Sequence, residues 1–223
     1  DLARGQLLAM IGPNGAGKST CFNLINGQLR PDGGTVSIMG KRTNGKKPRD
    51  VWKLGVGRTF QIAATFGSMT VLENVQMAKL SYHNRTKSLF KTVPKMDRDE
   101  AMELLKLVGI EDQNDRACGV LAYGDVKRVE LAIALANNPT LLLMDEPTAG
   151  MGPSERYGLM ELTADIVRTR NIGVLFTEHD MDMVFGQSDR IIVLNRGKLV
   201  AEGTPDDVRK NRRVQEIYLG EES

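Results

Sequence analysis

The segment LLAMIGPNGAGKST, residues 7–20, decides the fold. A short apolar run is followed by a glycine-rich loop and then by a segment with helical spacing that Gly27 closes. A buried strand that leads through glycines into a helix is typical of α/β proteins. We therefore predict a mostly parallel sheet that contains residues 7–12, followed by a helix at residues 20–26.

The loop GPNGAGKST matches the pattern G-x-x-x-x-G-K-[ST], which binds polyphosphate. Glycines allow backbone N–H groups to converge on phosphate oxygens, and the following helix adds the dipole of its N-terminus. Lys18 supplies a cation to the β and γ phosphates, and the Ser19 hydroxyl can ligate Mg²⁺. The predicted nucleotide-binding residues of this loop are Gly12, Pro13, Asn14, Gly15, Ala16, Gly17, Lys18, Ser19 and Thr20.

The rest of the chain alternates short apolar runs with helical patterns. We predict strands at residues 140–145, 172–180 and 190–197, and helices at 126–136 and 154–170, the second capped by Ser154. The middle is helical, with amphipathic segments VLENVQMAKL and DEAMELLKLVGI. We therefore predict one domain, residues 1–223, in which 1–69 and 120–223 form an α/β core and 70–119 a helical subdomain. We also expect further strands upstream of Asp1.

Composition and charge restrict the class of protein. A net charge of +2, with 26% charged and 41% apolar residues, is ordinary for a globular protein and gives no reason to expect nucleic acid as a partner. No apolar run approaches the roughly 18–20 residues needed to cross a bilayer. Cys21 and Cys118 lack metal-ligand or redox spacing, which favours two reduced thiols. We interpret the basic segment KRTNGKKPR, residues 41–49, as a solvated turn, with an anionic partner as the alternative.

Acidic residues end the second predicted strand, LLLMDE. A phosphate-binding loop needs a second ligand for Mg²⁺, usually an aspartate at the end of a neighbouring buried strand, and Asp145 has this position. Glu146 follows directly, and we expect it to polarise the attacking water as a general base. His179 closes VLFTEHD at the carboxyl end of another strand, where it could donate to the γ-phosphate or position the water. We interpret the other histidine, His83, as a surface residue.

Taken in order, these elements resemble the nucleotide-binding domain of ABC ATPases. GPNGAGKST resembles the Walker A motif, LAYGD the signature motif, LLLMDEP the Walker B motif, Gln61 the Q-loop glutamine and His179 the H-loop histidine. By this resemblance, Gln61 is a candidate catalytic residue that senses the γ-phosphate and Mg²⁺. The segments RTFQ, MTVLENV, DEPTAGM, EHDMDMVF and AEGTPDDVR…YLG are similar to the branched-chain amino-acid importer ATPases.

The resemblance implies a function and its partners. Two such domains meet head to tail, as a homodimer or heterodimer, and each ATP lies between one loop and the partner's signature motif. In this chain, that motif consists of Leu121, Ala122, Tyr123, Gly124 and Asp125. ATP and Mg²⁺ are the implied cofactors. Hydrolysis powers import of a small solute, such as a branched-chain amino acid, through membrane permease subunits on which the helical subdomain docks from the cytoplasmic face.

Two other functions remain open from the sequence. One is an ABC-type ATPase that acts on nucleic acid or ribosomes, although this chain lacks a long coiled coil and a second fused domain. The other is a module that binds ATP without hydrolysing it, against which Glu146 and His179 argue.

Three features depart from the family pattern. Ala122 and Tyr123 replace the usual serine and first glycine of the signature motif, and Ala122 removes a hydroxyl that would bond the γ-phosphate. Gly152 stands where an aspartate is usual after Walker B. The aromatic residue that stacks on adenine would lie upstream of Asp1. We therefore expect the ATP site that receives this signature motif to be weakened rather than abolished.

Overall fold

The computed structural model describes residues 1–59, 65–83 and 95–219. Six strands form one sheet in the order β4-β5-β6-β1-β7-β8. Their bounds are β1 (Leu7–Ile11), β4 (Val56–Thr59), β5 (Leu141–Asp145), β6 (Gly173–Thr177), β7 (Arg190–Asn195) and β8 (Lys198–Gly203). The first five strands of this order pair in parallel, and β8 runs antiparallel to β7. The predicted α/β fold with a mostly parallel sheet is confirmed.

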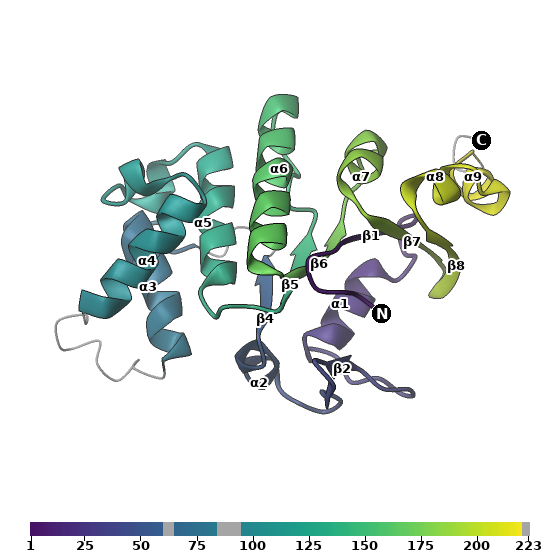
Figure 1. Cartoon of the computed structure of the whole chain (residues 1–223), viewed down its shortest axis with the longest axis horizontal. Coiled ribbons are helices and arrows are strands. Elements are labelled where there is room, and N and C mark those ends of the chain that lie inside the picture. Colours follow the sequence, from purple (N-terminus) through teal and green to yellow (C-terminus); the bar gives the residue numbers. More distant parts are fainter. Residues whose placement is uncertain (60–64, 84–94, 220–223) are drawn as a thin grey trace.

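Helices cover the sheet on both faces, as Figure 1 shows. On β1, Leu7, Ala9 and Ile11 pack into the same apolar core as α5 (Tyr123–Leu135), α6 (Pro153–Arg170) and α7 (Met181–Gln187). The alternate residues Leu8 and Met10 face α1 (Lys18–Ile25) and α2 (Pro48–Lys53) on the other side. Burial on both faces explains why β1 is apolar at every position.

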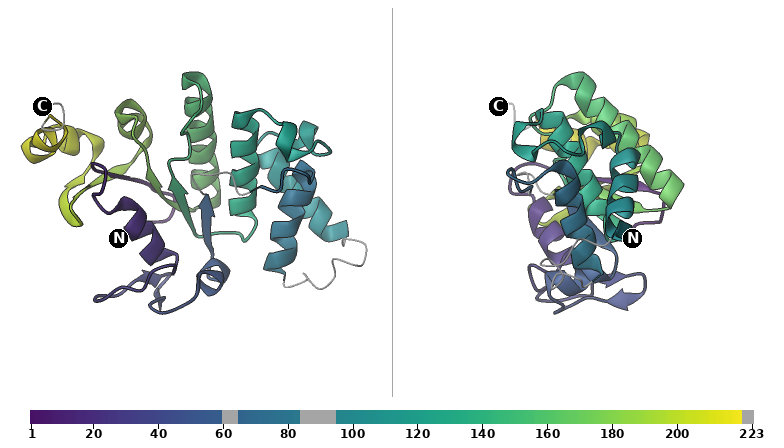
Figure 2. Two further views of the ribbon diagram at one scale, coloured as in Figure 1. Left: turned by 180° about the vertical axis from the view of Figure 1, so that it is seen from behind. Right: turned by 90° about the vertical axis from the view of Figure 1, so that its left-hand side faces the viewer.

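The predicted helical subdomain contains α3 (Val71–Tyr82) and α4 (Lys95–Leu107), followed by short 3₁₀ turns at Glu111–Gln113 and Cys118–Val120. Helices α3 and α4 pack on each other and on α5, and they stand beyond the β4 edge of the sheet (Figure 2). Thr70 begins α3 with a reciprocal cap, because its hydroxyl accepts from Glu73 N and its own N–H donates to Glu73 Oε2. Thr70 also pairs with Ala117 in an isolated bridge, which brings the two ends of the segment together.

Smaller elements complete the described chain. A short hairpin joins β2 (Ser37–Ile38) to β3 (Lys41–Arg42), and the chain ends in α8 (Pro205–Arg209) and α9 (Arg212–Leu219). Residues 41–49 are therefore not a simple turn, since they contain β3 and the start of α2, although their lysines and arginines are exposed. In the described parts of the chain, no helix has the length and apolar character needed to cross a membrane.

Several helices begin earlier than the sequence pattern predicts. Helix α1 begins at Lys18 and α5 at Tyr123, because glycine or alanine serves as the cap and no capping side chain marks the start. Ser154 does not cap α6, so that prediction is wrong. Gly152 caps this helix instead and Pro153 takes its first position, where its fixed φ favours the helix.

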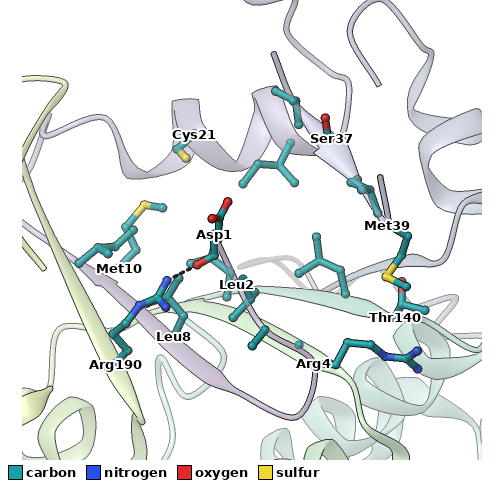
Figure 3. A pocket seen from close by; sticks show the side chains of 18 of the residues that line it. Asp1, Leu2, Arg4, Leu8, Met10, Cys21, Ser37, Met39, Thr140 and Arg190 are labelled. Carbon is teal, nitrogen blue, oxygen red and sulfur yellow. Dashed lines mark hydrogen bonds between the residues drawn. The ribbon is translucent and has the colours of Figure 1, made fainter. Parts of the chain in front are cut away.

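An apolar hollow of about 460 Å³ lies on the α1 face of the sheet (Figure 3). Its lining includes Leu8, Met10 and Cys21, together with Thr140 and Arg190 at the amino ends of β5 and β7. Ligands of open α/β sheets bind at the carboxyl ends of the strands. This hollow therefore lies away from the expected nucleotide site.

Candidate nucleotide site

The loop between β1 and α1 has a backbone that only glycine adopts easily. Gly12, Gly15 and Gly17 have φ angles of 149°, 77° and 105°. A Cβ atom at Gly12 would stand 2.1 Å from the carbonyl oxygen of Leu194. The loop is also tied to the β7–β8 turn, since Gly197 N donates to Ala16 O at 2.8 Å. The sequence pattern thus specifies a fixed concave backbone at the carboxyl end of β1.

Lys18 reaches back over this loop from the first turn of α1. Its Nζ donates to the carbonyl oxygens of Gly12 and Pro13, at 2.6 and 3.3 Å. Ser19 and Thr20 follow in the same turn, where N–H groups have no partner within a helix. The nine predicted loop residues, 12–20, form this loop and the first turn of α1, whose N–H groups suit an anion.

Asp145 ends β5 directly beside Thr177, the last residue of β6. The hydroxyl of Thr177 donates to Asp145 Oδ1 at 2.9 Å. Asp145 lies on the α1 face of the sheet because Leu141 and Leu143, its alternate neighbours on β5, pack with Phe22 of α1. Asp145, the predicted Mg²⁺ ligand, thus lies on the same face of the sheet as the helix that follows the phosphate loop.

Glu146 has a left-handed backbone, with a φ of 49°. Such a conformation costs about 1–3 kcal/mol in a residue with a side chain. It is held by the Glu146 N–H, which donates to the Thr177 carbonyl at 3.2 Å and to the Thr177 hydroxyl at 3.0 Å. Thr177 therefore positions both carboxylate residues, and the sequence analysis missed it because threonine is common in strands.

His179 lies against the carboxylate of Glu146. Its Nε2 is 2.8 Å from Glu146 Oε1, and since an ionised carboxylate only accepts hydrogen bonds, Nε2 carries the hydrogen. The His179 side chain is 57% exposed and that of Glu146 is 21% exposed, so the pair is open to solvent. Two of the three predicted catalytic residues, Glu146 and His179, are thus in contact, and the third, Gln61, lies outside the described residues.

Glu178 is a buried carboxylate that the sequence did not single out. Its Oε1 accepts from the Thr148 N–H at 3.0 Å and from the Thr148 hydroxyl at 2.7 Å. Its Oε2 accepts from the His179 N–H at 3.3 Å. Glu178 thereby links Thr148, two residues after Glu146, to the backbone of His179. The available signal in the sequence was a glutamate that stands between an apolar strand and a histidine.

Arg58, on β4, is the third residue that sequence reasoning missed. Its Nη2 is 3.6 Å from Asp145 Oδ2, and both side chains are largely buried, at 12% and 16% exposed. Burial lowers the pKa of the Arg58 guanidinium, while the Asp145 carboxylate acts in the opposite direction. Arginine keeps its charge in proteins. The two oxygens of Asp145 therefore have different partners, Thr177 on one and a cation on the other.

The donor set near Asp145 fits Mg²⁺. Among the described residues, no group of three or more histidine, cysteine, aspartate or glutamate side chains could hold a metal by itself. Mg²⁺ prefers hard oxygen ligands and commonly takes one carboxylate plus phosphate and water. Asp145 and the Ser19 hydroxyl are ligands of this kind. Gln61, the other predicted metal ligand, lies outside the described residues.

The LAYGD segment forms the start of α5. Ala122 is the N-cap and its side chain makes no capping hydrogen bond. Gly124 lies against Glu155 of α6, and the ring of Tyr123 lies against Gly150 in the loop that follows Glu146. Asp125 accepts from Gln113 Nε2 at 2.8 Å. The first turn of α5 therefore presents backbone N–H groups without a side-chain cap.

This helix start stands apart from the phosphate loop of its own chain. Helix α5 packs against β4, and two strands, β5 and β6, separate β4 from β1. Three strand spacings of about 4.8 Å correspond to about 14 Å. Helices α5 and α1 also cover opposite faces of the sheet (Figure 1). The two predicted phosphate-binding elements therefore do not meet within one chain.

His83, which we interpreted as a surface residue, is partly buried. Its side chain is 24% exposed, and its Nε2 lies 3.3 Å from Glu100 Oε2. Glu100 also accepts from Lys79 Nζ at 2.6 Å. These residues join α3 to α4, away from the phosphate loop. Both cysteines are free, as expected, and burial raises the pKa of each thiol.

Comparisons with known proteins agree with this geometry. Residues 1–149 match the family model described as ABC transporter, and residues 198–223 match that of the branched-chain amino acid ATP-binding cassette transporter. The chain is similar to LivG, a high-affinity branched-chain amino acid transport ATP-binding protein of Escherichia coli K12. The two are 39% identical over 97% of this chain and 88% of LivG.

Solved structures are similar as well. A nucleotide-free ATP-binding cassette from an ABC transporter superposes with a TM-score of 0.86 at 30% identity, over 97% of this chain and 89% of that one. A dimeric ATP-binding cassette in a post-hydrolysis state, bound to ADP and Pi, gives a TM-score of 0.76 at 28% identity, over 92% and 88%. The fold, the loop and the two family matches together show that this chain belongs to the ABC transporter family, as an ATP-binding ATPase.

Proposed function

We propose that this chain hydrolyses Mg²⁺-bound ATP to power import of branched-chain amino acids through a separate membrane permease. The observation that carries this proposal is the arrangement at the carboxyl edge of the sheet. A rigid phosphate loop with Lys18 lies on the same side as Asp145, and Glu146 and His179 are already in contact there. This arrangement suits phosphoryl transfer to water rather than binding alone.

The binding roles follow from the donors present. The N–H groups of the loop and of the first turn of α1 hold the β and γ phosphates, and Lys18 moves from the loop carbonyls to the phosphate oxygens. Ser19 and Asp145 would hold Mg²⁺, and we extend this role to Gln61. When bound, Mg²⁺ offsets the charge that develops on the phosphate oxygens.

Glu146 acts as the general base in this proposal. Its strained backbone fixes the carboxylate at the end of β5, and His179 orients one of its oxygens. The other oxygen is then directed at a water in line with the γ-phosphate, and the proton of that water passes to the carboxylate. Once the nucleotide is in place, the His179 Nε2–H turns from Glu146 to a γ-phosphate oxygen, which frees the carboxylate to accept the proton of the water.

The signature motif completes the site of a second chain. LAYGD begins the helix that packs on β4, which lies about 14 Å across the sheet from β1, and this helix covers the face opposite α1, so its N–H groups serve a nucleotide held elsewhere. ABC ATPases dimerise and partner with permease subunits in transporter complexes. We propose that Leu121, Ala122, Tyr123, Gly124 and Asp125 face the ATP of the partner, whether that is a second copy or a paired subunit.

The transported solute is inferred from relatives. LivG is named for high-affinity branched-chain amino acid transport, and residues 198–223 match a model of such transporters. We therefore propose leucine, isoleucine and valine as cargo, and residues 70–119 as the part that docks on the permease at the cytoplasmic face of the membrane. The alternative of action on nucleic acid has no such support.

The proposal can be tested with the assembled complex. The tagged chain is purified from membranes of its own host, the integral membrane proteins that accompany it are identified, and the complex is placed in liposomes. We expect ATP-dependent uptake of radiolabelled leucine that the Glu146→Gln complex lacks. ATP hydrolysis without leucine uptake would contradict the cargo, and co-purification of nucleic acid without any permease would contradict transport.

A further inference from the structure

Arg58 is fixed against Asp145 by contacts on three sides. Its Nη1 donates hydrogen bonds to Asn23 Oδ1 and to Gln28 Oε1, both at 2.9 Å. The guanidinium carbon lies 5.7 Å from the centre of the Phe22 ring. Asn23 and Phe22 belong to α1, the helix that carries the predicted phosphate-binding lysine and serine. Arg58 therefore connects the phosphate-loop helix to the end of β5.

The position of Arg58 follows from strand alternation. Val56 of β4 and Leu143 of β5 share the core on the α1 face, and Arg58 stands two residues after Val56 on the same face. Leu143 and Asp145 have the same relation on β5. Arg58 and Asp145 therefore lie on the same face of the sheet, beside α1. The register between β4 and β5 brings Arg58 Nη2 to 3.6 Å from Asp145 Oδ2.

The charge of Arg58 acts on the same carboxylate that a metal would use. Asp145 Oδ1 accepts from Thr177, and Arg58 Nη2 lies 3.6 Å from Oδ2. A fixed cation at this distance opposes a second cation at the same carboxylate. It also offsets a negative charge that would otherwise repel the phosphates of a metal-free nucleotide.

We propose that Arg58 is a positioning residue that sets the metal dependence of nucleotide binding by balancing the charge of Asp145. The inference rests on the proposed role of Asp145 at Mg²⁺. Arg58 lets the site accept a metal-free nucleotide and keeps the affinity for Mg²⁺ low enough for release after hydrolysis. It touches neither substrate nor metal and acts through Asp145.

The test measures binding of a fluorescent ADP, so it does not depend on turnover. In Arg58→Gln we expect the affinity for metal-free ADP, measured with EDTA, to fall about fivefold to tenfold, as for one screened charge pair. We expect the free Mg²⁺ concentration that half-saturates the ADP complex to fall by a similar factor. A site that was merely distorted would weaken both interactions, so a joint loss, or no change in either, would overturn the inference.

Control variants separate the possible causes. Arg190→Gln removes an arginine paired with Glu202 at the amino end of β7, at the opposite end of the strands from Asp145, and it should leave both constants unchanged. The same shifts in that variant would overturn the inference. Arg58→Lys keeps the charge and should retain both constants within about threefold. If Arg58→Gln fails to fold, a joint loss of both affinities in Arg58→Lys contradicts the proposal.

Asp145→Asn distinguishes this inference from the proposed function. If Asp145 contacts Mg²⁺, this variant should raise the half-saturating Mg²⁺ concentration. No change in Asp145→Asn would refute the metal role itself, whatever Arg58 does. A change in Asp145→Asn with none in Arg58→Gln would refute the role of Arg58 alone.

Discussion

Single residues at the end of β5 decide the chemistry of this chain. Glu146 adopts a strained backbone that Thr177 stabilises from the neighbouring strand, and His179 contacts its carboxylate. Strain of this kind persists only where surrounding structure holds it in place. These contacts hold the carboxylate in one orientation, which reduces the reorganisation needed before it takes a proton from the attacking water.

The first prediction concerns Glu146→Gln. The amide keeps the shape of the side chain but cannot take a proton, so we expect ATP affinity to remain and turnover to fall at least about 100-fold. Phosphate release and titration with a fluorescent ATP analogue measure the two quantities. Glu161→Gln, on the exposed side of α6, is the matched control and should hydrolyse ATP normally. Turnover close to normal in Glu146→Gln would refute its role as base.

The sequence predicted the residues that carry a recognisable local pattern. The phosphate loop, Asp145, Glu146 and His179 each follow a strand or precede a helix, so position along the chain was enough. Arg58 and Thr177 could not be found in this way, because their roles depend on which strands are neighbours. The order β4-β5-β6 places one on each side of Asp145, and no local pattern specifies that order.

At the scale of elements, the start of α5 is the least usual feature. Ala122 occupies the N-cap with an extended backbone but offers no oxygen to the first N–H groups. A serine at this position would accept from the helix, which stabilises a protein by about 0.5–2 kcal/mol. The same hydroxyl could instead reach a phosphate of a partner's nucleotide.

We therefore predict two effects of Ala122→Ser. Without nucleotide, the free energy of unfolding in urea should rise by about 1 kcal/mol. With ATP, turnover should increase because the partner's site gains a donor. Ala122→Gly, which changes the backbone but adds no hydroxyl, should leave turnover unchanged. A gain in stability without a gain in turnover would show that the motif does not need this hydroxyl.

Helices α3 and α4 are joined by a largely buried ion pair. Lys79 Nζ lies 2.6 Å from Glu100 Oε2 and also donates to the Ala136 carbonyl at the end of α5. The hydrogen bond from Lys79 lowers the pKa of Glu100, whose ordinary value is 4.5. The ion pair therefore contributes fully to stability at pH values above the ordinary pKa of 4.5. This contribution is lost as the pH falls through the lower pKa that Glu100 has in the folded protein.

Lys79→Met should accordingly destabilise the protein by about 1–3 kcal/mol near neutral pH, since it leaves Ala136 O without this donor. The difference from the natural chain should shrink in urea unfolding as pH is lowered from about 7 to about 4. Lys106→Met removes an exposed pair with Glu103 and should cost less than about 0.5 kcal/mol. A pH-independent difference for Lys79→Met would contradict the role of Glu100.

The elements themselves were predicted unevenly, for physical reasons. Strands β1, β5, β6 and β7 are buried runs of apolar residues and were expected. Strand β4 is four residues long and contains a glycine and an arginine, and β8 is an edge strand with mostly exposed residues. Neither has enough apolar periodicity to be recognised from sequence.

For the whole molecule, the geometry implies that one chain carries parts of two different nucleotide sites. Its phosphate loop belongs to one site and its signature motif to another. The phosphate loop stands beside β1 and the signature motif beside β4, with two strands between them and helices on opposite faces. A nucleotide bound at the loop of one chain can meet a signature motif only from another. ATP would then stabilise the dimer, and hydrolysis would weaken it.

The most direct test combines Glu146→Gln with Gly124→Asp and measures mass by light scattering. A Cβ at Gly124 would meet side-chain atoms of Glu155 and Met151 at 3.3–3.6 Å, so a side chain fits with small adjustments, and its charge would face the partner's phosphates. Gly158→Asp, on α6 in open space, is the matched control. With ATP, we predict that Glu146→Gln alone and with Gly158→Asp doubles in mass, whereas Glu146→Gln/Gly124→Asp binds ATP equally well but remains a monomer. Dimerisation of that variant, or loss of ATP binding by its monomer, would contradict a site shared between two chains.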